Sequence, residues 1–140
     1  MPKLDAGACG LDYGCGPAPA LPPMLREAGF EVATWDPIYD VRPDVLERRY
    51  DFITCTEVIE HLHRPADTFR RLHRLLEPGG WLGLMTRFQT DDDRFANWHY
   101  RRDPTHVVFY REETLEHVAG RLGWEIETRP PNVAILGKPD

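Results

Sequence analysis

The stretch LDYGCGPA, residues 11–18, decides the fold of this 140-residue chain. It overlaps the end of a mostly apolar run at residues 8–13, which is typical of a short buried strand. Because glycine lacks a Cβ atom, Gly14 and Gly16 let the chain turn sharply and bring its backbone amides close to a ligand. The stretch therefore predicts a strand followed by a ligand-binding turn.

An acidic residue stands where a nucleoside ligand would need one. Asp36 closes the next predicted strand, at residues 30–36, roughly 20 residues beyond Gly14. An acidic side chain at that strand end can accept hydrogen bonds from both ribose hydroxyls. Ordinary turn glycines and a surface aspartate are the alternative, which the strand context and the acidic spacing disfavour. The two features together predict nucleoside binding.

The rest of the chain alternates between strand and helix patterns. Apolar runs predict further strands at residues 51–56 and 81–85, with a weakly marked strand near Val45. Prolines, glycines and apolar spacing predict helices at residues 24–28, after Pro65 and around 115–122, and residues 124–136 predict a terminal hairpin. This alternation implies a mainly parallel, doubly wound α/β sheet.

Composition favours one globular domain over residues 1–140. Apolar residues make up 41% and charged residues 29%, close to the globular average. A formal charge of −6 argues against a protein that grips nucleic acid by bulk charge. No apolar run approaches the roughly 18 residues of a membrane helix. Three cysteines, Cys9, Cys15 and Cys55, form no CxxC pair and favour a reducing compartment, so we expect a cytoplasmic protein.

The glycine turn also bears on which nucleoside is bound. Pro19 takes the third glycine position of the dinucleotide pattern GxGxxG, which disfavours a nicotinamide-dependent oxidoreductase. Asp12, Gly14 and Gly16, with Ala18 as the last residue, instead resemble the DxGxGxG motif of class I S-adenosylmethionine-dependent methyltransferases. The segments YDFITCTEVIEHL (residues 50–62) and LLEPGGWL (residues 75–82) resemble the fourth-strand and PGG segments of the same family.

This resemblance implies a Rossmann-like sheet of seven strands, mainly parallel with an antiparallel last strand, and methyl transfer from S-adenosylmethionine to a small-molecule acceptor. Nucleic acid is not the expected partner. A non-catalytic S-adenosylmethionine-binding module is the alternative. The family's helices before the first strand are missing here, so we expect a truncated version of a longer chain, or a wall supplied by residues 94–106, a second copy or another partner.

The resemblance also implies a set of donor-binding residues. Asp12 would orient the turn, the residues of the turn would lie against the methionine and ribose parts, and Asp36 would bind the ribose hydroxyls. Thr56 and Glu57 would line the methionine end, and Pro37 and Ile38 would adjoin the adenine. The full donor-binding set is Asp12, Gly14, Cys15, Gly16, Asp36, Pro37, Thr56 and Glu57, with Ile38 beside it.

Glu57, Glu60 and His61 form a candidate metal site. On a helical turn, residues at i, i+3 and i+4 share one face, and two carboxylates with an imidazole can hold a divalent cation. The pattern resembles the metal segment of small-RNA 2′-O-methyltransferases and of ubiquinone-pathway O-methyltransferases, which keeps an RNA 2′-O-methyltransferase as an alternative. Similar segments occur in methyltransferases without metal, so we expect a plain helix start, with carboxylates near its positive end.

The long connection at residues 94–106 is rich in aromatic and basic side chains. Trp98, His99, Tyr100 and His106 are candidates for an acceptor pocket, with His99 or His106 as the catalytic base, because imidazole titrates near neutral pH. The alternative is structural, with Trp98 and Tyr100 closing the core and His106 packed on Phe109.

The helix after Pro65 carries a basic face. Arg64, Arg70, Arg71 and Arg74 recur along it, beside His73. Since the chain is acidic overall, we expect this face to be solvated rather than to bind nucleic acid.

Overall fold

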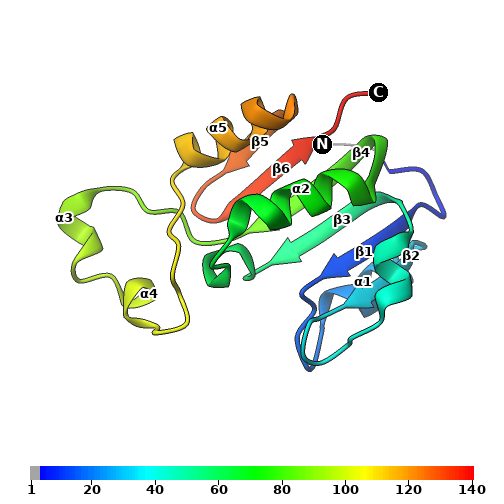
Figure 1. Ribbon diagram of the computed structural model, residues 1–140, viewed down its shortest axis with the longest axis horizontal. Helices are drawn as coiled ribbons and strands as arrows, with labels where there is room; N and C mark the ends of the chain where they lie inside the picture. The colour runs from blue at the N-terminus through cyan, green and yellow to red at the C-terminus, as the bar shows by residue number, and fades with distance from the viewer. Residues whose placement is uncertain (1–3) are drawn as a thin grey trace.

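A six-stranded sheet forms the centre of the computed structural model, which describes residues 4–140 (Figure 1). The strands are β1 (Cys9–Tyr13), β2 (Glu31–Trp35), β3 (Tyr50–Thr56), β4 (Leu76–Met85), β5 (Glu125–Arg129) and β6 (Val133–Gly137). Their order across the sheet is β2-β1-β3-β4-β6-β5. The pairs from β2 to β4 are parallel, and β6 runs antiparallel to both of its neighbours. The prediction of a mainly parallel sheet with an antiparallel last strand is confirmed.

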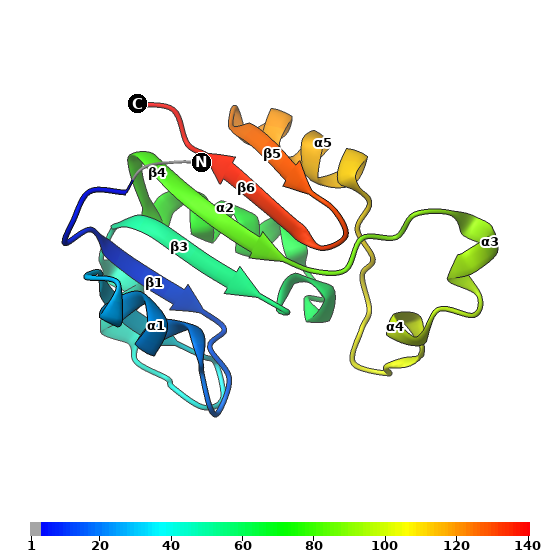
Figure 2. The ribbon, with the colours of Figure 1, turned by 180° about the vertical axis from the view of Figure 1, so that it is seen from behind.

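Helices cover the two faces of the sheet unequally. The helices are α1 (Leu21–Glu27), α2 (Pro65–Leu75), α3 (Asp92–Phe95), α4 (His99–Arg102) and α5 (Glu112–Leu122), with 3-10 turns η1 (Pro43–Glu47) and η2 (Ile59–His61). The helices α2 and α5 lie over one face, whereas α1 lies over the β1 and β2 side of the other (Figure 1). In the part of the chain that the structure describes, no helix covers β4 and β6 on that second face (Figure 2). No helix of residues 4–140 has the length and apolar character needed to cross a membrane.

The strand predicted near Val45 is wrong, so the described sheet has six strands instead of seven. Val45 lies in the 3-10 turn η1, where it is the buried residue. Pro43 begins this turn and has no N–H to give to a strand ladder. The guanidinium groups of Arg26 and Arg42 donate to the carbonyls of Val32 (2.6 Å) and Thr34 (2.9 Å) in β2. Side chains thus satisfy carbonyls on the β2 edge that another strand would otherwise pair.

The main core lies between the sheet and α2. Phe69, Leu72 and Leu75 recur at helical spacing on the buried side of α2. They belong to one apolar cluster with Leu82 and Leu84 of β4. Each large apolar side chain buried in this way contributes about 1.5–3 kcal/mol to the free energy of folding. This packing fixes β3 and β4, whose carboxyl ends carry the candidate site.

Two glycines in neighbouring parts of the sheet make a matched test of this packing. A Cβ atom on Gly10 of β1 would lie 2.2 Å from the buried Phe52 ring, whereas one on Gly83 of β4 would meet only a carbonyl oxygen at 3.9 Å. We expect Gly10→Ala to lower the free energy of unfolding by about 1–3 kcal/mol, because overpacking forces the ring and backbone to shift. Gly83→Ala should change it by less than about 1 kcal/mol. Urea unfolding of both variants measures the difference, and equal losses would contradict this account.

Candidate functional site

The glycine turn after β1 is tied to the end of β2. Gly14 and Gly16 both adopt left-handed backbone conformations, with φ of 77° and 71°. The backbone N–H groups of Gly14 and Cys15 donate to the carbonyl of Trp35, at 2.7 and 3.1 Å. A Cβ atom on Gly14 would also lie 2.6 Å from Val58, so the turn packs directly against the segment after β3. Glycine at position 14 is therefore required for both conformation and space.

Asp36 joins the two parts of the predicted nucleoside site. One oxygen, Oδ2, accepts a hydrogen bond from the Gly16 amide at 2.9 Å. The other, Oδ1, accepts from the amides of Ile38 (2.9 Å) and Tyr39 (3.0 Å). A carboxylate has about four acceptor positions, so these contacts leave one for a further donor. Asp36 is buried, Pro37 and Ile38 after it are exposed, and the side chain is oriented by three backbone amides.

The remaining donor-site candidates lie at neighbouring strand ends. Asp12 is buried in β1 and accepts a hydrogen bond from the Thr54 hydroxyl at 2.7 Å, while burial raises the pKa of its carboxyl. Thr56 closes β3, opposite Met85 of β4. Burial, with the charge of Asp12 next in effect, raises the pKa of the Cys15 thiol, so this residue is poorly suited to act as a thiolate nucleophile.

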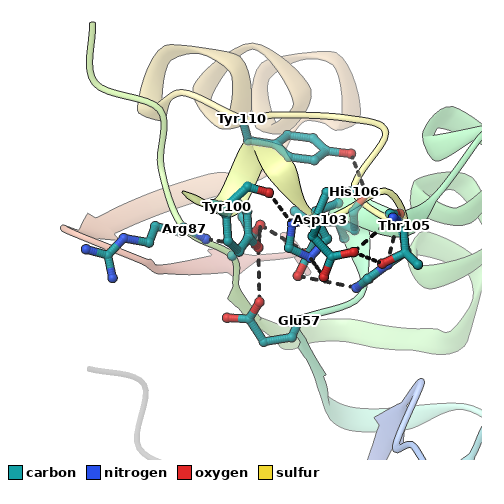
Figure 3. Close-up of polar contacts among 11 residues, drawn as sticks. Glu57, Arg87, Tyr100, Asp103, Thr105, His106 and Tyr110 are labelled. Carbon is teal, nitrogen blue, oxygen red and sulfur yellow. Dashed lines mark hydrogen bonds and ion pairs between the residues drawn. The ribbon is translucent and has the colours of Figure 1, made fainter. Parts of the chain in front are cut away.

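Glu57 follows β3 in a strained conformation. Its φ of 54° lies in the left-handed region, which only this non-glycine residue of the described chain occupies. Its amide donates to the Met85 carbonyl at 2.7 Å, and the Tyr100 hydroxyl donates to its Oε2 at 3.0 Å (Figure 3). Burial and the nearby Glu60 carboxyl raise the pKa of Glu57 to about 7. Strain and a perturbed pKa at one position are features that cluster at functional sites.

Glu60 is a fully buried carboxylate with one oxygen left over. The Thr86 hydroxyl donates to Oε2 at 3.0 Å and lies 3.1 Å from the Tyr100 hydroxyl. The other oxygen, Oε1, is buried without a hydrogen-bond partner among residues 4–140. A buried carboxylate oxygen without a partner is costly, and a bound cation is one way to satisfy it. Thr86 was not among the sequence candidates; its position just beyond β4 is the signal that could have found it.

His61 and His106 lie beside this oxygen, and His61 Nε2 is 3.9 Å from it. Their rings lie 4.7 Å apart, and the ligand atoms of Glu60, His61 and His106 all lie within 4.8 Å of one another. His61 Nδ1 lies 3.1 Å from the Thr105 carbonyl. His106 Nδ1 lies 2.6 Å from the Tyr100 carbonyl (Figure 3). A carbonyl only accepts, so each Nδ1 is the donor and, in the neutral ring, Nε2 keeps its lone pair. Metal-binding histidines are oriented by such second hydrogen bonds.

The connection after β4 contributes aromatic side chains as well as His106. The Trp98 and Tyr100 rings lie 5.0 Å apart, and the Tyr100 and His106 rings 4.1 Å. Trp98 also lines a hollow of about 230 Å³ together with Arg87 and residues of α3. His99 lies exposed on α4, and its side chain makes no hydrogen bond or ion pair with other residues of the described chain. Of the two histidines predicted as bases, only His106 is packed against the carboxylate group.

Comparison with known proteins finds methyltransferases by family, by sequence and by structure. Residues 1–129 match the family described as "methyltransferase domain". The chain is 30% identical over 86 residues to the ubiquinone biosynthesis O-methyltransferase of Pseudomonas aeruginosa strain PAO1. These 86 residues are 61% of this chain and 37% of that protein. Its counterpart from Serratia proteamaculans is 32% identical over 86 residues, with 61% and 36% covered. The chain thus spans just over a third of the length of these relatives.

Solved structures share the fold. A methyltransferase structure from Bacillus halodurans aligns with a TM-score of 0.69 at 18% identity, over 89% of this chain and 66% of that one. Phosphoethanolamine N-methyltransferase 2 of Haemonchus contortus, solved with S-adenosyl-L-methionine, also aligns with a TM-score of 0.69, at 15% identity over 99% of this chain and 50% of that one. With a glycine turn joined to an acidic strand end and a family match over residues 1–129, the chain belongs to the methyltransferase domain family.

Proposed function

We propose that this chain binds S-adenosylmethionine at the carboxyl ends of β1 and β2 and transfers its methyl group to a small-molecule acceptor. The observation that carries the proposal is the hydrogen bond from the Gly16 amide to the Asp36 carboxylate. It holds the glycine turn and the ribose-binding acid in one unit, and Asp36 keeps one acceptor position for a ribose hydroxyl. The similar fold of a methyltransferase solved with this donor supports the choice of ligand.

Methyl transfer from S-adenosylmethionine requires mainly that the protein position the donor and the acceptor. When bound, S-adenosylmethionine supplies a methyl group on a sulfonium, and the neutral thioether left after the transfer is a good leaving group. Holding donor and acceptor in line accounts for most of the rate, and a base is needed only for an acceptor that must lose a proton. In this chain, Gly14 and Gly16 would fix the donor, and Glu57 would hold the acceptor's proton. The high pKa of the buried Cys55 thiol argues against a cysteine nucleophile.

We further propose that Glu60, His61 and His106 hold a divalent cation, in place of the plain helix start expected from the sequence. Support comes from Glu60 Oε1, which accepts no hydrogen bond from residues 4–140, and from the two imidazoles, whose Nδ1 atoms donate to carbonyls. Each Nε2 lies near a carboxylate oxygen but beyond hydrogen-bond distance, at 3.9 Å from Glu60 Oε1 for His61 and 3.6 Å from Asp103 Oδ2 for His106. A carboxylate with two imidazoles suits Zn²⁺ or Mn²⁺. A cation there would act as a Lewis acid on an acceptor oxygen, which favours O-methylation. The sequence candidate Glu57 would be a neighbour of this site.

We also propose a compartment and a partner for this protein. Cys9, Cys15 and Cys55 are all free thiols, which supports a reducing compartment such as the cytoplasm. No helix of residues 4–140 covers one side of β4 and β6 (Figure 2), which supports a covering partner such as a second copy of this chain.

Calorimetric titration of the chain with three ligands tests the proposed donor. We expect saturable binding of S-adenosylmethionine and of its demethylated product, and none of NADH, because Pro19 replaces the third dinucleotide glycine. Binding of NADH alone would overturn the proposal. Incubation with labelled donor and a panel of catechol, phenol and amine acceptors then separates an enzyme from a binding module, since only an enzyme releases the demethylated product in proportion to methylated acceptor.

A further inference from the structure

Four arginines surround a hollow on the side of the molecule where β3 begins. The hollow has a volume of about 240 Å³ and is lined by residues of α2, of the end of η1 and of the segment that follows η1. Figure 1 shows where these elements lie beside the start of β3. Its lining residues are Leu46, Glu47, Arg48, Arg49, Arg71, Arg74 and Leu75. Arg48 and Arg49 directly precede the amino end of β3, whereas the proposed methyl-transfer site lies beyond the carboxyl ends of the strands. The hollow is therefore a separate feature of the fold.

The guanidinium groups around this hollow are poorly neutralised. Within residues 4–140, no carboxylate lies within 4.0 Å of the guanidinium of Arg48, Arg71 or Arg74, and Arg49 reaches Glu77 only at 3.9 Å. Arg71 donates to the Tyr13 hydroxyl at 3.2 Å, and Arg48 lies 5.7 Å from the centre of the Tyr50 ring. These two contacts hold the side chains in place without cancelling their charge.

The neighbouring arginines on the same helix behave differently. Arg64 and Arg70 both form ion pairs with Asp67, the first at 2.9 Å. The basic face that the sequence predicts along this helix is thus divided in two. One half is paired and solvated as expected, and the other half, Arg71 and Arg74, faces the hollow together with Arg48 and Arg49.

The like charges of these arginines repel one another, and a bound anion would reduce that repulsion. Four arginines and a single acidic residue, Glu47, line one hollow in a chain whose formal charge is −6. Guanidinium groups match phosphate oxygens in geometry, and the arginines lie on two sides of the hollow, Arg71 and Arg74 on α2 and the other two just before β3. We propose that this hollow binds a diphosphate group, either as free pyrophosphate or as part of a nucleoside diphosphate. One compact hollow, rather than a track of basic side chains, favours such a ligand over a nucleic-acid strand.

Titration calorimetry with pyrophosphate, at an ionic strength held constant with sodium chloride, tests the proposal. We expect saturable binding to the full chain, and Arg74→Ala should weaken it by about tenfold or more, since one charge-assisted contact is lost. Arg64→Ala is the matched control, because it removes the same charge from the helix start and should leave the affinity within about twofold. Without pyrophosphate, Arg74→Ala should melt at the same or a higher temperature than the parent chain, because repulsion is relieved.

A second arm uses ADP to identify the source of the diphosphate. Binding of ADP that is tighter than that of pyrophosphate and is weakened by Arg74→Ala supports a nucleotide, and tighter binding of pyrophosphate supports the free anion. The proposal is overturned if pyrophosphate gives no saturable binding, or if Arg64→Ala weakens it as much as Arg74→Ala. It is also overturned if a single-stranded RNA oligonucleotide binds and pyrophosphate does not displace it. None of these readouts depends on methyl transfer, so they remain informative whether or not the proposed function holds.

Discussion

Replacement of Asp36 by alanine is expected to lower the affinity for S-adenosylmethionine by about 100-fold. The variant loses the acceptor for a ribose hydroxyl and also the Oδ2 contact that holds the Gly16 amide. Hydrogen bonds to a charged group contribute about 1.5–3 kcal/mol each, so two such losses account for a change of this size. Titration calorimetry of the variant with S-adenosylmethionine measures it.

A control of equal charge separates this effect from a general one. Asp44→Ala removes a carboxylate from the exposed side of η1, and it should bind the donor within about twofold of the parent chain. Circular dichroism at the titration temperature verifies that Asp36→Ala is folded. Donor affinity within threefold of the parent chain in a folded Asp36→Ala would show that this carboxylate does not bind the ribose.

Replacement of Glu60 by glutamine is expected to abolish stabilisation by divalent cations. Glutamine keeps an oxygen that can accept from the Thr86 hydroxyl but removes the negative charge beside His61 and His106. A ligand that binds only the folded state at 100 times its dissociation constant adds about 2.7 kcal/mol to the free energy of unfolding. Thermal unfolding is measured with and without Mn²⁺. Mn²⁺ should raise the free energy of unfolding of the parent chain by this amount and leave that of Glu60→Gln unchanged.

Glu116→Gln is the corresponding control, because Glu116 is exposed on α5 and the same change of charge there should leave the effect of Mn²⁺ intact. If methyl transfer is detected, a chelator should lower its rate while leaving the affinity for S-adenosylmethionine unchanged, since the donor turn lies outside the cation site. Equal stabilisation of Glu60→Gln and the parent chain by Mn²⁺ would contradict the proposed site.

Local patterns predicted most of the elements, because each rests on signals a few residues apart. The helix after Pro65 was predicted from apolar residues at helical spacing, and α2 runs over Pro65–Leu75. The terminal hairpin was predicted from two short runs around a Pro-Pro pair, and it forms as β5 and β6. Val45 was misassigned since a single buried apolar residue after a proline fits a strand or a 3-10 turn equally well, and side-chain contacts to the β2 edge decide between them.

The sequence by itself determined the alternation of most strands and helices, the glycine turn and the acid at the end of the second strand. Each of these depends on backbone conformation or local periodicity, which nearby residues specify. Only the tertiary structure brought His106 to Glu60 and His61, across 46 positions of the chain from Glu60, and only it divided the arginines of α2 into a paired set and an unpaired set. Distances between residues far apart in sequence follow from how the sheet and its connections pack, and no local pattern encodes them.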